Sequence, residues 1–132
     1  VLHGHSLGSC IVFDHCWETK HRIAGLFTTG SPITKYSGMY PEWGHLPGRD
    51  DRTRGKELDF WVNFIAWRDL VCSGFRKHKS MQFRDFVEDV EIGSWNPLNF
   101  PYLKRHGLYW NHKKVHQVIA EKLVQHLLAT SS

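Results

Sequence analysis

Apolar positions along the chain fall into short runs separated by polar connections. A stub at residues 1–2 ends at a turn, and longer runs follow at residues 23–29, 60–67 and 86–92, the last with acidic residues interspersed. Runs of this length, rich in β-branched and aromatic side chains, are typical of strands buried on both faces of a sheet, as in parallel sheets. The pattern therefore predicts a mostly parallel sheet of about four strands.

Helical patterns flank these runs. Residues 7–20 place apolar side chains at roughly helical spacing, which predicts a helix of three or four turns. Asn111 is expected to cap a final helix, because Asn side chains accept hydrogen bonds from helix N-termini. The apolar stripe of that helix comprises Val115, Val118, Ile119, Leu123 and Leu127, widened by Ala120, Val124 and Leu128. Strands that alternate with helices in this way predict the α/β class.

Two connections interrupt the alternation. Residues 33–57 have no sustained period and are rich in Gly, Pro, Trp and charge. This stretch is either a lid or substrate wall or an irregular crossover with no binding role. Residues 70–84 are expected to form a shorter connection with one broken helix.

The length and composition fit one domain. The chain has 132 residues, of which 41% are hydrophobic, and this is enough to bury a core. It opens with Val1 in what has the pattern of the end of a buried strand. We therefore expect residues 1–132 to be the C-terminal part of a domain whose N-terminal strands are missing. No run of 18 apolar residues and no secretion signal occurs, so no transmembrane segment is expected.

Cysteine usage and charge bear on the setting and the partners. The three cysteines are odd in number and lack a C-x-x-C pair, which favours reduced thiols and a cytoplasmic location. The net charge is +4, with basic groups at residues 76–79, 104–105 and 113–114. These groups fit a solvated surface or a peripheral attraction to an anionic substrate or membrane. No nucleic-acid partner is expected, because no fingerprint accompanies the charge. The oligomeric state is left open.

A serine motif lies at the start of the chain. Gly4-His5-Ser6-Leu7-Gly8 fits the pattern G-x-S-x-G, between an apolar stub and a helical pattern. In proteins with this motif the serine occupies a sharp strand-to-helix turn, the nucleophile elbow. Gly4 and Gly8 are expected to let the strand and the helix of this elbow approach closely. The motif predicts Ser6 as a nucleophile and the Leu7 backbone N–H as an oxyanion donor.

An acid and a base follow Ser6 in the chain. Asp69 comes directly after the run at residues 60–67, and His106 lies in the loop after the run at residues 86–92. Because carboxyl ends of parallel strands share one edge of a sheet, these side chains are expected to converge there. His106 would take the proton of Ser6, and Asp69 would orient the imidazole. The fallback acids are Asp50, Asp59 and Asp89, and the fallback bases are His78 and His112.

Metal binding by paired histidines is a weaker hypothesis than the serine, acid and base assignment. His3 and His5 form one pair and His112 and His116 another, the second pair one helical turn apart. No Glu follows His112 as in H-E-x-x-H, and the spacing offers no third ligand. We therefore expect no metal site.

Four stretches together resemble the α/β-hydrolases of the lipase and serine esterase type. They are Gly4–Ser9, Thr28–Pro32, Trp61–Asp69 and His106–Trp110. In such proteins the strand after the elbow commonly ends in a G-S-P turn, the acid follows a W-x-N strand, and the base histidine precedes a Tyr-Trp pair. The resemblance is to the C-terminal half of the domain, an incomplete α/β-hydrolase fold.

The resemblance implies hydrolysis of a small-molecule or lipid ester through an acyl-enzyme on Ser6. The triad would be Ser6, Asp69 and His106, with no metal or organic cofactor. A second oxyanion donor would come from the missing N-terminal half, so the fragment alone is expected to be inactive. The alternative is a hydrolase-like domain without catalysis that serves as a binding or scaffold module.

Overall fold

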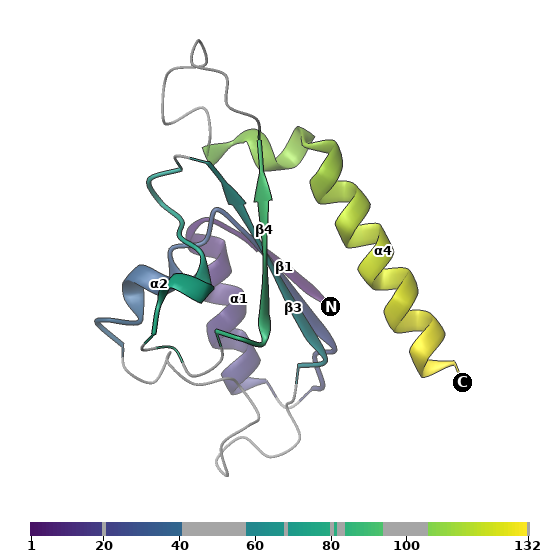
Figure 1. The fold of residues 1–132 in the computed structure, drawn as a ribbon. Coiled ribbons are helices and arrows are strands. Elements are labelled where there is room, and N and C mark those ends of the chain that lie inside the picture. Colours follow the sequence, from purple (N-terminus) through teal and green to yellow (C-terminus); the bar gives the residue numbers. More distant parts are fainter. Residues whose placement is uncertain are drawn as a thin grey trace.

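The four predicted strands form one all-parallel sheet in this computed structural model, which describes residues 1–19, 21–40, 58–67, 69–79, 81, 84–93 and 106–131. The strands are β1 (Leu2–His5), β2 (Gly25–Thr29), β3 (Phe60–Ala66) and β4 (Val87–Ile92), in the spatial order β1-β2-β3-β4. The prediction of a parallel sheet of about four strands is confirmed, and so is the α/β class (Figure 1).

Helices cover both faces of this sheet. The helix α1 (Leu7–Glu18) and the short α2 (Ile33–Tyr36) lie on one side, and α4 (Lys113–Thr130) lies on the other (Figure 1). Two 3-10 turns lie in the connections: η3 (Phe75–Lys77) between β3 and β4, and η4 (Leu108–Asn111) between β4 and α4. The helix predicted over residues 7–20 ends at Glu18, within the usual uncertainty of helix ends.

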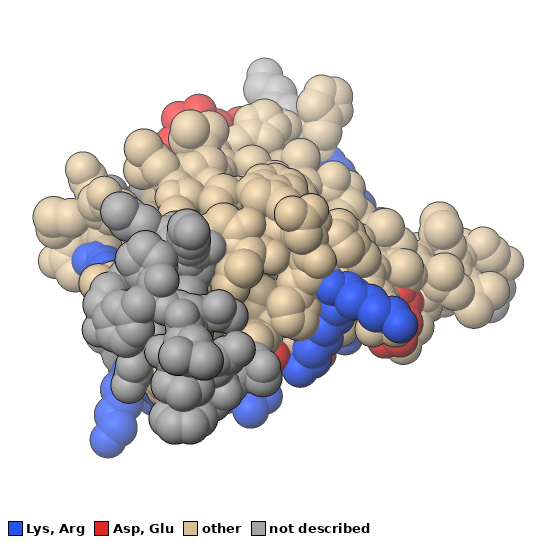
Figure 2. Space-filling view, turned by 90° about the horizontal axis from the view of Figure 1, so that it is seen from above, with Lys and Arg blue, Asp and Glu red and all other residues tan. Residues whose placement is uncertain are grey.

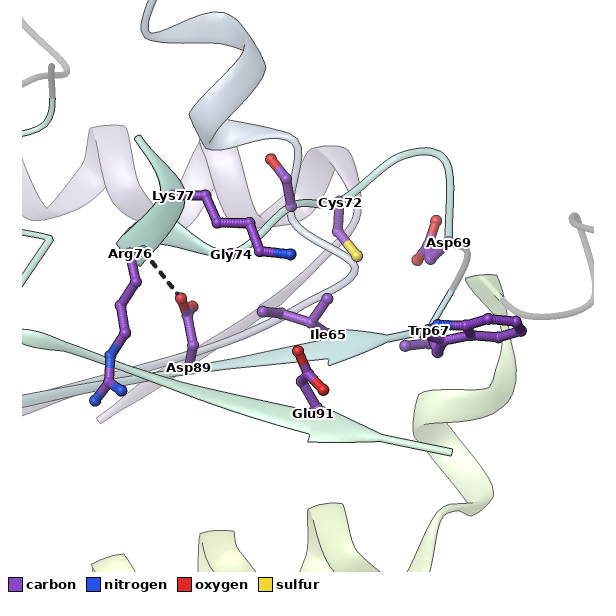
Figure 3. A pocket seen from close by; sticks show the side chains of 11 residues that line it. Ile65, Trp67, Asp69, Cys72, Gly74, Arg76, Lys77, Asp89 and Glu91 are labelled. Atoms are coloured by element: carbon purple, nitrogen blue, oxygen red, sulfur yellow. Dashed lines mark hydrogen bonds between the residues drawn. The ribbon is translucent and has the colours of Figure 1, made fainter. Parts of the chain in front are cut away.

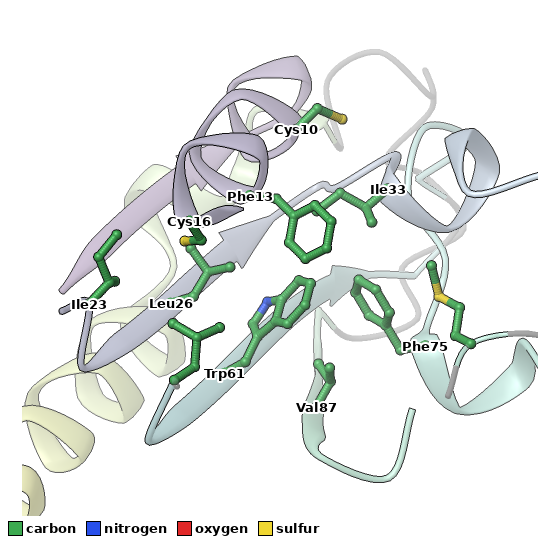
Figure 4. Close-up of a cluster of buried hydrophobic side chains, with 11 residues drawn as sticks. Cys10, Phe13, Cys16, Ile23, Leu26, Ile33, Trp61, Phe75 and Val87 are labelled. Atoms are coloured by element: carbon green, nitrogen blue, oxygen red, sulfur yellow. The ribbon is translucent and has the colours of Figure 1, made fainter. Parts of the chain in front are cut away.

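Aromatic side chains fill the layer between α1 and the sheet. Phe13 of α1 packs 5.2 Å from the ring of Trp61 on β3, and Phe75 of η3 lies 4.8 Å from the same ring (Figure 4). The Trp61 indole N–H donates to Thr28 Oγ1 at 2.9 Å, so its polar atom is satisfied in the core. The cluster as a whole consists of Cys10, Phe13, Cys16, Ile23, Leu26, Ile33, Leu58, Trp61, Phe75, Met81 and Val87. This layer fixes the helix that follows Ser6 against the sheet.

A second core lies between the sheet and α4. Successive residues of a strand point to opposite faces, so Leu26 belongs to the first core and Phe27 to the second. The second core contains Phe27, Val62, Phe64, Ala66, Val90, Ile92, Tyr109 and Val115, with Val118, Ile119 and Leu123 packed against it.

Part of the apolar stripe predicted for α4 is exposed. Leu127 was predicted to belong to the apolar stripe, but it is 62% exposed, and Val124 and Leu128 are exposed as well. The prediction was wrong about the side of the helix, because His126, in the same turn as Leu127, still packs against Phe60 of β3 at 5.7 Å. At 100° per residue, Val124 and Leu128 project from the opposite side of α4.

The predicted cap of α4 is also wrong. Asn111 ends the 3-10 turn η4, and His112 occupies the N-cap position without a side-chain cap hydrogen bond. The local preference of Asn for a cap is overridden by tertiary packing, because Tyr109 in the same turn is buried in the second core.

The structure also bears on the cysteines and on membrane-spanning helices. Cys10, Cys16 and Cys72 are all free and buried. No helix in the described part of the chain has the length and apolar character needed to cross a membrane.

Candidate active site

Ser6 occupies a strained turn between β1 and α1. Its backbone has φ 53° and ψ −130°, and among the residues that the structure describes it is the one non-glycine residue with positive φ. Such a conformation costs about 1 to 3 kcal/mol and persists only where the surroundings impose it. Here the Ser6 N–H donates to Thr29 O at 2.9 Å, and the Ser9 N–H donates to Ser6 O at 2.9 Å. The turn is therefore held by β2 on one side and by α1 on the other.

Two buried hydroxyls support this turn from below. Ser9 Oγ donates to Ser6 O at 2.6 Å and lies 2.7 Å from Ser31 Oγ. Ser31 belongs to the Gly30-Ser31-Pro32 turn after β2, so that turn is coupled to the serine elbow through side chains.

The two glycines of the motif differ in what they contribute. A Cβ on Gly4 would lie 2.5 Å from Ser9 Cα and 2.8 Å from Gly8 O, so the close approach of β1 and α1 requires glycine there. Among the described residues, a Cβ on Gly8 would meet nothing within 4 Å beyond its chain neighbours and its own helix backbone. The described part of the chain therefore shows a steric need for glycine at Gly4 and none at Gly8.

This difference gives a matched pair of substitutions. We expect Gly4→Ala to lower the free energy of unfolding by about 1 to 3 kcal/mol, because backbone atoms must shift. Gly8→Ala should raise it by up to about 1 kcal/mol, because alanine is the better helix former. Urea unfolding of both variants measures the effect, and equal stabilities would contradict the packing described.

The predicted acid and base meet in a hydrogen bond. His106 Nδ1 lies 2.9 Å from Asp69 Oδ2, and the Asp69 side chain is 1% exposed. A carboxylate only accepts, so Nδ1 carries the hydrogen and Nε2 is left free to accept a proton. This is the tautomer that a general base for a serine hydroxyl needs.

Tyr109 completes the surroundings of Asp69. Its hydroxyl donates to Asp69 Oδ2 at 2.7 Å and accepts from the Ala66 N–H at 2.9 Å, and the Val71 N–H donates to Asp69 Oδ1 at 2.9 Å. Burial opposes ionisation of Asp69, but the hydrogen bonds from His106, Tyr109 and Val71 outweigh it and hold the pKa of the carboxyl below its usual value. Burial also raises the pKa of Tyr109 far above its ordinary range, so the phenol keeps its proton.

Removal of the Tyr109 hydroxyl tests this arrangement. Tyr109→Phe leaves the Ala66 N–H without its acceptor and Asp69 with one donor fewer, and we expect the free energy of unfolding at neutral pH to fall by about 1.5 to 3 kcal/mol.

The pH dependence of that loss gives a second readout. Because the folded-state pKa of Asp69 is lowered, its stabilising contribution is complete above the ordinary value of 3.8 and is lost as the pH falls through the folded-state value. The difference between wild type and Tyr109→Phe in urea unfolding should therefore narrow below about pH 4. A difference independent of pH would contradict the role assigned to the phenol.

Gly30 brings His106 up to the serine elbow. Gly30 follows Thr29, has φ +58°, and a Cβ there would lie 2.9 Å from His106 Cε1. The His106 ring also lies 4.8 Å from the ring of His5, the residue before Ser6. The base thus packs against both segments that hold Ser6. The structure gives no hydrogen bond between the Ser6 hydroxyl and the His106 ring, a contact that often tightens only with substrate bound.

The predicted oxyanion donor lies at the start of α1. Leu7 is the first residue of that helix, so its backbone N–H is one of the amides that have no acceptor within the helix. The positive end of the helix dipole lies at the same place. Leu7, Ser6 and the Asp69–His106 pair thus all lie at the carboxyl edge of the sheet.

The two fallback acids that the structure describes, Asp59 and Asp89, do not lie after the carboxyl end of a strand. Asp59 lies before β3, at the opposite end of the sheet, and pairs with Arg22 at 2.9 Å. Asp89 lies within β4 and accepts from Asn63 Nδ2 at 2.9 Å and from the Arg76 N–H at 3.1 Å. Asp50 is outside the described residues.

Neither fallback base is hydrogen-bonded to Asp69. His78 bonds to Ser73 Oγ through Nε2, and His112, the N-cap of α4, has a buried Nδ1 without a hydrogen-bond partner among the described residues. Within the described ranges, no group of three or more His, Cys, Asp or Glu side chains could hold a metal ion.

A cavity borders the acid on the side of β4. Its volume is about 380 Å³, and Asp89 and Glu91 point toward it from β4 (Figure 3). The lining consists of Ile65, Ala66, Trp67, Asp69, Cys72, Ser73, Gly74, Arg76, Lys77, Asp89 and Glu91. Neither Ser6 nor His106 belongs to this lining, so the cavity lies beside Asp69 and not at Ser6.

Some exposed apolar side chains lie close to Ser6 and His106 in the chain, and the described basic side chains are dispersed on the face seen from above (Figure 2). Seen from above, Lys and Arg side chains lie in separate groups and not in one continuous patch (Figure 2). Leu7, Leu108 and Trp110 are exposed and are neighbours of Ser6 or His106 in the chain. These apolar side chains offer a surface for an uncharged ligand.

Comparison of the chain with family models, with curated proteins and with solved structures found no match in any of the three. The account of function therefore depends on the residues and their geometry.

Proposed function

We propose that the protein is a serine hydrolase that cleaves a carboxylic ester through an acyl-enzyme on Ser6. The observation that carries this proposal is the packing of the hydrogen-bonded Asp69–His106 pair against the strained turn that bears Ser6. Acyl transfer to a hydroxyl requires a nucleophile, a base beside it and an acid that orients the base.

The fold supports an assignment to the α/β-hydrolases of the lipase and esterase type. Ser6, Asp69 and His106 follow β1, β3 and β4 in chain order, and these strands are parallel members of one sheet, with β2 between β1 and β3. The order serine, acid, histidine is that of α/β-hydrolases.

In the proposed reaction Ser6 Oγ attacks the ester carbonyl carbon while His106 Nε2 takes the hydroxyl proton. Asp69 stabilises the imidazolium that forms, and the Leu7 N–H donates to the developing oxyanion. The tetrahedral intermediate then collapses, the C–O bond of the ester breaks, and the leaving alcohol takes the proton from His106. Water, deprotonated by His106, then attacks the acyl carbon. The bond between that carbon and Ser6 Oγ breaks, Ser6 Oγ takes the proton back from His106, and the carboxylic acid is released. These steps need no metal or organic cofactor.

The exposed apolar residues beside the site favour an ester with an uncharged acyl group. Leu7 adjoins the nucleophile, and Leu108 and Trp110 follow the base. A small-molecule or lipid ester fits this setting better than a charged substrate.

The proposal is tested with p-nitrophenyl esters of increasing acyl length, using the protein produced from its complete reading frame. We expect an initial burst of nitrophenol close to one equivalent per protein, and a mass increase equal to the acyl group on the peptide that contains Ser6. The binding or scaffold alternative predicts neither. Absence of both from a folded sample at every acyl length would therefore contradict the proposal.

A further inference from the structure

His5 connects the nucleophile turn to the base. It is the last residue of β1, is half-buried, and its Nδ1 lies 3.1 Å from Thr29 O. Because a carbonyl only accepts, Nδ1 must carry a hydrogen, and Nε2 is the atom that would take a second proton. Thr29 O also accepts the Ser6 N–H. The His5 ring and the Ser6 backbone are thus anchored on one carbonyl.

The other side of the His5 ring faces the segment that bears the base. Its centroid lies 4.8 Å from that of His106, 5.2 Å from Trp110 and 5.6 Å from Tyr109. The rings of His5 and His106 are tilted by 34°. The His5 ring therefore packs between Thr29, whose carbonyl also holds the Ser6 N–H, and the segment that bears His106.

The charged and titratable groups around His5 come from three segments. His106 and Tyr109 lie on the base segment, Asp69 follows β3, and His3 lies on β1 itself. Burial and then the neighbouring His106 lower the pKa of His5, while the Thr29 hydrogen bond and Asp69 oppose that shift. The net effect keeps His5 neutral near neutral pH.

We propose that His5 is a positioning residue whose neutral ring holds the His106 imidazole in place beside Ser6, and whose protonation stops proton transfer. The inference rests on the proposed function. A charged His5 would oppose the imidazolium that forms on His106 during the reaction, because two like charges would then lie about 5 Å apart.

Two substitutions separate the contacts of His5. His5→Asn keeps an N–H donor for Thr29 but removes the ring and its charge, whereas His5→Phe keeps a ring beside His106 but removes the donor and the charge. His3→Asn is the matched control, because His3 also bonds to Thr29, through Nε2 to Oγ1 at 3.2 Å, but makes its ring contacts with Phe27 and Trp110.

The measurement is kcat and kcat/KM against pH for the four proteins on one p-nitrophenyl ester. We expect kcat/KM of wild type and His3→Asn to fall on the acid side with a slope that steepens from one toward two, since two protonations inactivate. Both His5 variants should keep a slope of one. His5→Asn should lose about tenfold to a hundredfold in kcat with little change in KM, because the base is no longer held.

Three results would overturn the inference. The first is an acid-side slope of kcat/KM that stays at one in wild type. The second is a slope in both His5 variants equal to a wild-type slope of two. The third is a folded His5→Asn protein with the kcat of wild type. The proposed function is tested separately, by the covalent reaction of wild type with a fluorophosphonate. Wild type that reacts, with His5 variants indistinguishable from it, removes only the role of His5. Wild type that does not react removes both.

Discussion

Ser6→Ala is expected to lower kcat for ester hydrolysis by about a million-fold, to the level left by binding and the oxyanion donor. The substitution removes the only atom that can form the proposed acyl-enzyme. It leaves the fold intact, because no side-chain hydrogen bond of Ser6 contributes to the described structure and alanine shares the cost of positive φ. Initial rates with a p-nitrophenyl ester measure the effect.

Two further variants show whether the loss belongs to the hydroxyl. Ser6→Gly should be equally inactive yet more stable by about 1 kcal/mol or more, because glycine adopts positive φ without strain. Ser9→Ala removes the neighbouring hydroxyl that donates to Ser6 O and should reduce activity far less. Retention of substantial hydrolysis by Ser6→Ala would mean that another group is the nucleophile.

Asp69→Asn is expected to lower kcat by about ten-thousand-fold. The amide would present N–H groups to His106 Nδ1, so the hydrogen of the imidazole would move to Nε2, which could then no longer accept the proton of Ser6. His106 Nδ1 and the Tyr109 hydroxyl share Oδ2, so the amide nitrogen at that position would also face Tyr109, which loses its acceptor, while the amide oxygen can still accept from the Val71 N–H. A lower free energy of unfolding is therefore expected beside the kinetic loss. Steady-state kinetics and thermal unfolding together separate this effect from a loss of fold.

Asp89→Asn is the matched control for that prediction. Asp89 is a carboxylate on the neighbouring strand, hydrogen-bonded to Asn63 and to the Arg76 amide and not to a histidine. We expect its kcat to stay within a few-fold of wild type, provided that the variant folds. A larger loss in Asp89→Asn than in Asp69→Asn would show that the acid has been misassigned.

The sheet was predictable because buried strands leave a recognisable pattern of apolar residues in the sequence. A strand covered on both faces must be apolar along its length, so the runs that became β2 and β3 stand out from polar connections. The covered side of α4 was not predictable in the same way. Apolar side chains lie on more than one side of this helix, and only the packing against the sheet shows which side is covered, since His126 contacts Phe60 whereas Val124 and Leu128 are exposed.

The candidate site was predictable in its members but not in its contacts. Strand ends and chain order indicated Ser6, Asp69 and His106, because parallel strands bring their carboxyl ends to one edge. Tyr109 lies 40 residues from Asp69, and no local pattern shows that its hydroxyl reaches the acid. The contact of His5 with His106 likewise depends on how two distant segments converge. The sequence signal nearest to these contacts was the Tyr-Trp pair after His106.

The most direct test of the central claim is labelling with a fluorophosphonate probe, which reacts covalently with activated serines. Wild type, Ser6→Ala and His106→Ala, each produced from the complete reading frame, would be treated with the probe, digested and mapped by mass spectrometry. We predict one labelled site, on the peptide that contains Ser6, and loss of the label in both variants. A folded wild-type protein without label, or with label that persists in Ser6→Ala, would contradict the assignment of Ser6 as an activated nucleophile.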